Sequence, residues 1–165
     1  MRPKRWVGVT TRGMIEVYGP RGPYARVYVH YDMYPDGNMC QVAKFLSDKH
    51  FGGDDDFKTI YGMDNLAAQL VAYLTNYYTK IIRRHHKGGK EDLAAGAVYL
   101  YPPGVDSDAQ YLYQLLPISE DSRDALDAIW ISAKGWDYNL GKFVEFFSGT
   151  LRDYAKQFCK AQGSA

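Results

Sequence analysis

Apolar and polar residues alternate along the early part of the chain with the period of two that is typical of β-strands. The clearest case is the segment 25–32. Its apolar row consists of Val27, Val29 and Tyr31. Its polar row consists of Arg26, Tyr28, His30 and Asp32. Because successive side chains of a strand point to opposite faces, one face of this strand is expected to carry a cation, a phenol, an imidazole and a carboxylate.

Further strands are predicted at 5–11, 14–19, 95–101, 110–116 and 128–133. Pro20-Arg21-Gly22-Pro23 is a turn sequence, so the strands on either side of it are expected to pair as an antiparallel hairpin.

Apolar residues at spacings of three and four predict three helical regions. The first begins at Asn38 and the second, which is the longest, begins at Asp64 or Asn65. The third begins at Asn139 and carries one apolar face formed by Leu140, Phe143, Phe147, Leu151, Tyr154 and Phe158. The expected order is β-β-β-α-α-β-β-β-α. This order favours a single α+β domain over 1–165, with a mainly antiparallel sheet and helices packed on one face.

Composition adds few constraints. The chain has 165 residues and a formal net charge of +1, so any affinity for nucleic acid or membrane would have to be local. No apolar run is long enough to span a membrane. The basic N-terminus is not followed by the apolar segment of a signal peptide. We therefore expect a cytoplasmic protein, in the host cytoplasm if it is viral.

Two residue types stand out. Cys40 and Cys159 fit no metal or redox motif, and each is expected in a helix as a reduced, buried thiol, with a disulfide as the alternative. The chain also has 15 tyrosines, a residue suited to interfaces and planar ligands but also common at half-buried strand positions. Those at 99, 101, 111 and 113 would form either an aromatic platform or part of the core.

Four blocks of sequence belong together. They are Thr11-Arg12-Gly13, His30-Tyr31-Asp32-Met33-Tyr34-Pro35-Asp36-Gly37, Gly62-Met63 with the following 66–72, and Tyr99-Leu100-Tyr101-Pro102. In these blocks the chain resembles a loose group of small phage, prophage and bacterial proteins, although Met33 stands where the group has glycine. The resemblance implies a mobile-element origin and carries no activity.

His30, Asp32 and Asp36 form the first candidate site. An imidazole and two carboxylates could bind a ligand, hold a divalent metal or perform acid–base chemistry. They could equally form a structural hydrogen-bond network at the end of the strand. Arg12 precedes a glycine that would let the backbone approach closely, and its guanidinium is suited to phosphate or carboxylate unless it pairs with a nearby aspartate.

A basic segment at 80–87 includes Arg83, Arg84 and Lys87. These cations could contact nucleic-acid phosphates, or they could simply complement the C-terminal dipole of the preceding helix.

The preferred hypothesis is a non-enzymatic binding protein that recognises a nucleotide-like anion or a host protein, as an antagonist of host defence would. The resemblance implies that a phage, a virus or another mobile element encodes it. Its ligand-binding residues would be Arg12, Tyr28, His30, Asp32 and Asp36. One alternative is a metal-dependent phosphoester hydrolase that uses His30, Asp32 and Asp36, and another is a nucleic-acid binder that uses the 80–90 patch. No cofactor and no resident metal are expected, and a homo-oligomer is compatible with the sequence.

Overall fold

The computed structural model describes residues 11–52, 56–85, 96–118 and 124–159, with the backbone alone at 81–85. In these residues a 6-stranded sheet has the order β5-β2-β1-β6-β7-β8. The strand bounds are β1 Gly13–Gly19, β2 Gly22–Val29, β5 Val98–Leu100, β6 Tyr111–Pro117, β7 Ile129–Asp137 and β8 Lys142–Thr150. Neighbouring strands are antiparallel except for β1 and β6, which run parallel. A separate short pair is formed by β3 (His50–Phe51) and β4 (Thr59–Ile60).

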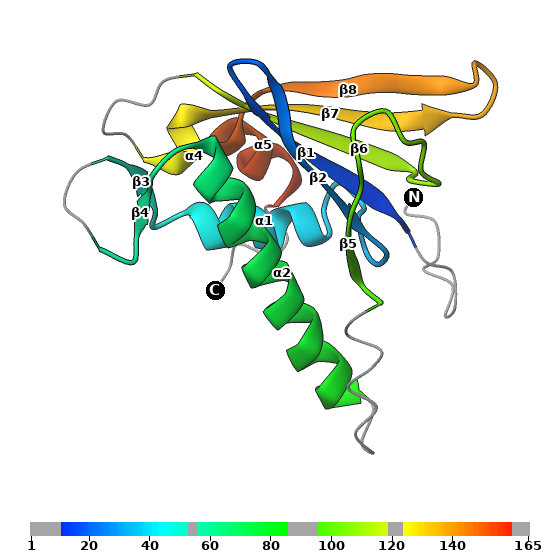
Figure 1. The fold of residues 1–165 in the computed structure, drawn as a ribbon. Helices are drawn as coiled ribbons and strands as arrows, with labels where there is room; N and C mark the ends of the chain where they lie inside the picture. Colours follow the sequence, from blue (N-terminus) through cyan, green and yellow to red (C-terminus); the bar gives the residue numbers. More distant parts are fainter. Residues whose placement is uncertain (1–10, 53–55, 86–95, 119–123, 160–165) are drawn as a thin grey trace.

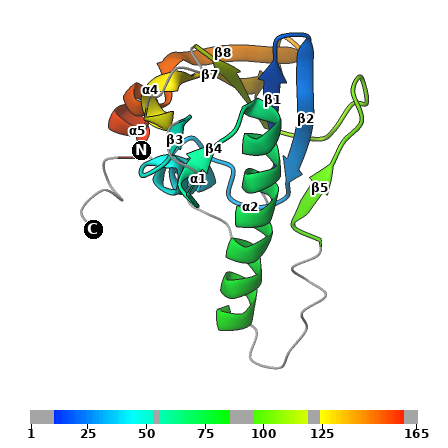
Figure 2. The same cartoon turned by 60° about the vertical axis from the view of Figure 1, so that its left-hand side comes forward.

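The helices pack against one face of this sheet (Figure 1). They are α1 Asn38–Leu46, α2 Met63–His85, α4 Ala125–Ala128 and α5 Leu151–Phe158. The expected α+β class, with helices on one face of a mainly antiparallel sheet, is confirmed. Figure 2 shows that the C-terminal part of α2 runs on beyond the sheet. No helix among the described residues is long and apolar enough to cross a membrane.

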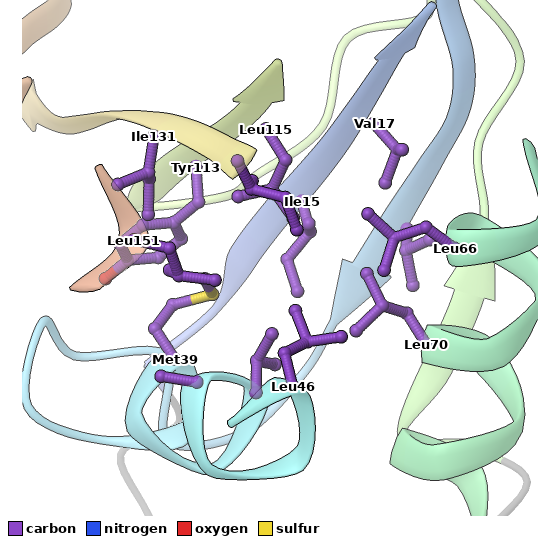
Figure 3. Close-up of a cluster of buried hydrophobic side chains, with 14 of the residues drawn as sticks. Ile15, Val17, Met39, Leu46, Leu66, Leu70, Tyr113, Leu115, Ile131 and Leu151 are labelled. Carbon is purple, nitrogen blue, oxygen red and sulfur yellow. The ribbon is translucent and has the colours of Figure 1, made fainter. Parts of the chain in front are cut away.

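The main core lies between the sheet and the helices, and alternation within the strands creates it. Ile15 and Val17 of β1 and Val27 and Val29 of β2 point to the helical side and are completely buried. Figure 3 shows Ile15 and Val17 on the side of the sheet that faces α1 and α2, where Leu46, Leu66 and Leu70 lie. The intervening residues of the same strands therefore point to the opposite face of the sheet, which we call the open face.

The antiparallel hairpin of β1 and β2 is confirmed, but β2 ends at Val29 and not at Asp32. The strand expected at 5–11 lies outside the described residues except for Thr11.

The prediction of a terminal helix from Asn139 was wrong over its first half. Residues Lys142–Thr150 form β8, and only Leu151–Phe158 are helical. A reverse turn precedes β8: the Asp137 carboxylate accepts the backbone N–H groups of Asn139 and Leu140, and Gly141 has a φ of 63°. This turn closes a hairpin, and pairing with β7 along its length outweighs the helical spacing of the apolar residues.

The expectation of reduced thiols was also wrong. A disulfide joins Cys40 in α1 to Cys159 just after α5, across a sequence separation of 119. Because α1 packs against α5, the Cα atoms of Cys40 and Cys159 lie 5.5 Å apart. Because structural disulfides are typical of oxidising surroundings, the cytoplasmic location stays a prediction.

Candidate functional site

The loop that follows β2, residues 30–37, is held from the helical side by tyrosine hydroxyl groups. The donors come from α2, β6 and α5, and each donates to a backbone carbonyl of the loop. The pairs, donor first, are Tyr78 to Tyr31 at 2.7 Å, Tyr113 to Met33 at 2.6 Å, and Tyr154 to Pro35. We call these three donors the tyrosine clamp. They satisfy backbone carbonyls that turn toward the interior, and the Tyr31 carbonyl also accepts from the side-chain amide of Asn38.

Close backbone approaches explain two glycines of the four sequence blocks as structural residues. A Cβ at Gly37 would lie 2.3 Å from the carbonyl oxygen of Asp32, and a Cβ at Gly13 would lie 2.6 Å from the Cβ of Met33. The backbone N–H of Met33 also donates to the carbonyl of Thr11. The Thr11-Arg12-Gly13 block and the 30–37 loop therefore pack directly against each other.

The two loop aspartates lie near the tyrosines of the helical side. Asp32 has a left-handed backbone with a φ of 53°, which ends the strand alternation. Burial first, and the Asp32 carboxylate second, raise the pKa of Tyr77 and Tyr78. Burial is likewise the main cause of the raised pKa of Tyr154, to which the Asp36 carboxylate contributes.

On the open face, by contrast, Asp108 brings Arg12, Tyr28 and His30 together. The Tyr28 hydroxyl donates to Asp108 Oδ1 at 2.7 Å, and Arg12 Nη1 lies 3.3 Å from Asp108 Oδ2. His30 Nδ1 lies 3.0 Å from the Tyr28 oxygen. Since that hydroxyl gives its proton to Asp108, Nδ1 of His30 is the donor in this contact.

Aromatic neighbours surround Tyr28. Its ring stacks on Tyr101 with centroids 5.3 Å apart, and Tyr99 lies 5.7 Å away. Burial, followed by the hydrogen bond to Asp108, raises the pKa of Tyr28, so the phenol stays neutral and acts as a donor. Tyr99 and Tyr101 thus share the open face, whereas Tyr113 belongs to the main core and the four tyrosines form no common platform.

The loop 102–110 that carries Asp108 is anchored to the open face by Arg26. The guanidinium donates to Glu16 at 2.9 Å through Nε, and its Nη1 donates to the carbonyls of Pro102 at 2.7 Å and Val105 at 2.8 Å. Burial opposes ionisation of Glu16, but hydrogen bonds from Gln114 and Arg26 outweigh it and lower its pKa. Arg26, which shares a face with Tyr28, therefore has a structural role.

Two hollows of about 310 Å³ each lie beside this loop and share Ser107 and Trp136 in their walls. We call the one that contains Arg12 the arginine hollow. Its walls are formed by Arg12, Ser107, Asp108, Ala109, Gln110, Trp136 and Tyr138. The neighbouring hollow is lined by Met14, Glu16, Arg26, Asp106, Ser107, Leu112, Trp136 and Phe143. Cation, carboxylate and aromatic rings thus border a single region of the surface.

Arg12 is incompletely paired in this region. Its Nη1 contacts Asp108, and its backbone N–H donates to the side-chain oxygen of Gln110 at 3.2 Å. Its Nε is shielded from solvent and has no hydrogen-bond partner among the described residues. Buried donors are nearly always satisfied in folded proteins, so this guanidinium has one donor that the described part of the chain does not use.

Of the ligand-binding residues predicted from the sequence, Arg12 lines the arginine hollow, whereas Tyr28 and His30 contact each other beside it. The sequence analysis did not single out Asp108, Trp136 or Tyr138. Asp108 lies 80 residues from Tyr28 along the chain, and no local pattern links them. Trp136 and Tyr138 lay between the strand predicted to end at 133 and the helix predicted to begin at Asn139, whereas β7 continues to Asp137. The available signal was the alternating Trp136–Tyr138 pair ahead of a glycine turn.

The metal hypothesis finds no support in this geometry. No three His, Cys, Asp or Glu side chains in the described part of the chain lie close enough to hold a metal ion. His30 contacts the open-face residue Tyr28, whereas Asp32 and Asp36 act on tyrosines of the helical side.

The basic segment at 80–90 lies largely outside the residues that the structure describes. The backbone of α2 includes Arg83 and Arg84, but their side chains, and all of Lys87, lie outside the described residues.

Comparisons with protein-family models, with curated proteins and with solved structures found no significant match to this chain. The arrangement on the open face is therefore interpreted from its own chemistry.

Proposed function

We propose that the protein binds a planar, anionic ligand of the nucleotide class in the arginine hollow. Arg12 would hold the phosphate, and the ring of the base would lie against Trp136 or Tyr138. The observation that carries this proposal is the placement of an incompletely paired guanidinium in the same hollow as two aromatic side chains.

The chemistry of the residues favours this ligand class. A guanidinium offers several N–H donors in one plane, which match the oxygens of a phosphate, and aromatic side chains stack on any base. Asp108 already shares the charge of Arg12, but its side chain is 59% exposed and the contact is a single one at 3.3 Å. An exposed ion pair of this kind contributes little to stability, so a phosphate could displace the carboxylate at small cost.

The size of the site limits the ligand. A hollow of about 310 Å³ lies at the lower end of the range for small-molecule sites. A mononucleotide that extends into the neighbouring hollow would fit these dimensions better than a dinucleotide. If the protein has the mobile-element origin that the sequence resemblance implies, sequestration of such a ligand is one way in which it would act against host defence.

The test is a calorimetric and thermal-shift panel of mononucleotides, the matching nucleosides and inorganic phosphate. We expect at least one nucleotide to bind, the nucleoside to bind much more weakly, and Arg12→Ala to weaken binding by about tenfold or more, which is the loss of one charge-assisted contact. Trp136→Ala should weaken binding of the nucleotide but not of phosphate.

Arg21→Ala is the matched control, because Arg21 is an exposed arginine in the β1–β2 turn, away from the hollow. It should leave binding unchanged. If no nucleotide binds, or if Arg12→Ala and Arg21→Ala behave alike, the proposal is wrong.

A further inference from the structure

The two edges of the sheet differ in length. Within the described residues β8 pairs with β7 alone, so one side of a 9-residue strand is an open edge. The opposite edge is β5, which has only 3 residues. An open edge presents backbone N–H and C=O groups that another strand can pair with, and a strand of this length offers about 30 Å of such edge.

The side chains near this edge are apolar on both faces of the sheet. On the open face Phe143 packs edge-on against Trp136, with centroids 5.1 Å apart. On the helical side Val144 and Phe146 are 40% and 39% exposed. In Figure 1 the turn end of the β7–β8 hairpin projects away from α4 and α5. Phe146 lies further along the strand and contacts Phe158 of α5 edge-on.

The charge of β8 permits pairing with an identical strand. The strand carries one cation, Lys142, and one anion, Glu145, and so has no net charge. A bulge at Phe146 interrupts the register with β7 but leaves Lys142–Glu145 regularly paired. Bulges and charges are common protections of edge strands, and here the regular half of β8 combines a neutral charge balance with exposed apolar side chains.

We infer that β8 is a self-association edge, at which a second copy of this chain adds its own β8 in antiparallel orientation. This pairing is isologous, because each copy uses the same strand, and it closes as a dimer with one continuous sheet. The short β5 edges that remain at both ends offer too little strand for further growth, so the assembly stops at two copies.

The test measures the molar mass of the full chain by light scattering and sedimentation over a wide concentration range. We expect a monomer–dimer equilibrium with no larger species. If the two-fold axis passes through the regular segment Lys142–Glu145, the two copies of residue 144 lie close together, so Val144→Lys and Val144→Glu should each weaken dimerisation by at least tenfold through like-charge repulsion. Mixing the two variants should restore dimers, since the opposite charges then attract.

Leu100→Lys is the matched control, because Leu100 is 66% exposed and lies on β5, at the opposite edge of the sheet from β8. It should dimerise like the original protein, and circular dichroism should show that all variants remain folded. A monomer at every concentration, open-ended oligomers, or a mixture of Val144→Lys and Val144→Glu that stays monomeric would each overturn the inference.

Discussion

Two groups of tyrosines lie on opposite faces of the same sheet and interact with different partners. Tyr78, Tyr113 and Tyr154 of the tyrosine clamp donate to backbone carbonyls of the 30–37 loop. On the open face, Tyr28 bonds to the side chains of Asp108 and His30. Backbone partners cannot be displaced without moving the chain, whereas the exposed carboxylate of Asp108 can rotate away. The clamp therefore maintains the architecture, and the open face retains the groups that are free to exchange partners.

The comparison predicts that the clamp side supplies most of the stability. The disulfide lies on that side, where it ties α1 to the segment just after the helix that carries Tyr154. Replacing both cysteines by alanine should lower the free energy of unfolding by about 2–5 kcal/mol, because the loop that the bond closes is long. Urea unfolding with and without reductant measures this.

In the double variant the reductant should have no effect. If the original protein has two titratable thiols while fully folded, or if its stability is the same with and without reductant, the covalent link does not contribute as we describe.

Alkaline pH should lower the free energy of unfolding through the residues of the tyrosine clamp. Burial raises the pKa of Tyr78 and Tyr154 above the ordinary value of 10.0. Below that pH both the folded and the unfolded state keep these phenols protonated, and their contribution to stability is complete. As the pH rises above 10.0, the unfolded state ionises first, so the free energy of unfolding falls. Urea unfolding on either side of this pH checks the slope, and Tyr78→Phe should make it shallower.

A slope that is the same in the original protein and in Tyr78→Phe would show that the lysines, and not the clamp, dominate alkaline unfolding.

The architecture could be predicted because local patterns encode it. Val27 and Val29 alternate with Tyr28, the turn at 20–23 closes the first hairpin, and α1 begins at Asn38 as its apolar spacing requires. The β8 strand could not be predicted from spacing alone, because Phe143, Phe147 and Leu151 recur every four residues and also fit a helix. Pairing with β7, a tertiary interaction, decides between the two.

The candidate site was predictable only where it follows one strand. Tyr28 and His30 were predicted from the alternation of polar and apolar residues in β2. This alternation ends at Asp32, where the backbone is left-handed and the loop contacts the tyrosine clamp. Asp108 and Trp136 reach the same region from distant parts of the chain. They come close together because β1 pairs with β6 in parallel, and no local sequence pattern predicts this pairing.

Removing a single hydroxyl from each group sharpens the comparison. Tyr113→Phe leaves the Met33 carbonyl in the core without its donor and should cost about 1–3 kcal/mol of stability with no effect on nucleotide binding. Tyr28→Phe should cost about 1 kcal/mol or less, because Asp108 is exposed and can bond to water, but it should change nucleotide affinity. Chemical unfolding and calorimetry on both variants separate the effects. Equal stability losses would remove the distinction between the two faces.

The smallest effect on stability is expected from Asp108→Asn, which alters only the open face. The amide keeps an acceptor for Tyr28 but removes the charge that pairs with Arg12. Because exposed ion pairs are weak, stability should change by about 1 kcal/mol or less. The pKa of Tyr28 should fall toward its ordinary value, since the nearby carboxylate helps to raise it, and ultraviolet titration of tyrosinate measures this. With the competing carboxylate gone, a nucleotide should bind more tightly. Weaker binding would instead mean that Asp108 contacts the ligand itself, and the assignment of the guanidinium as the main anchor would then have to be revised.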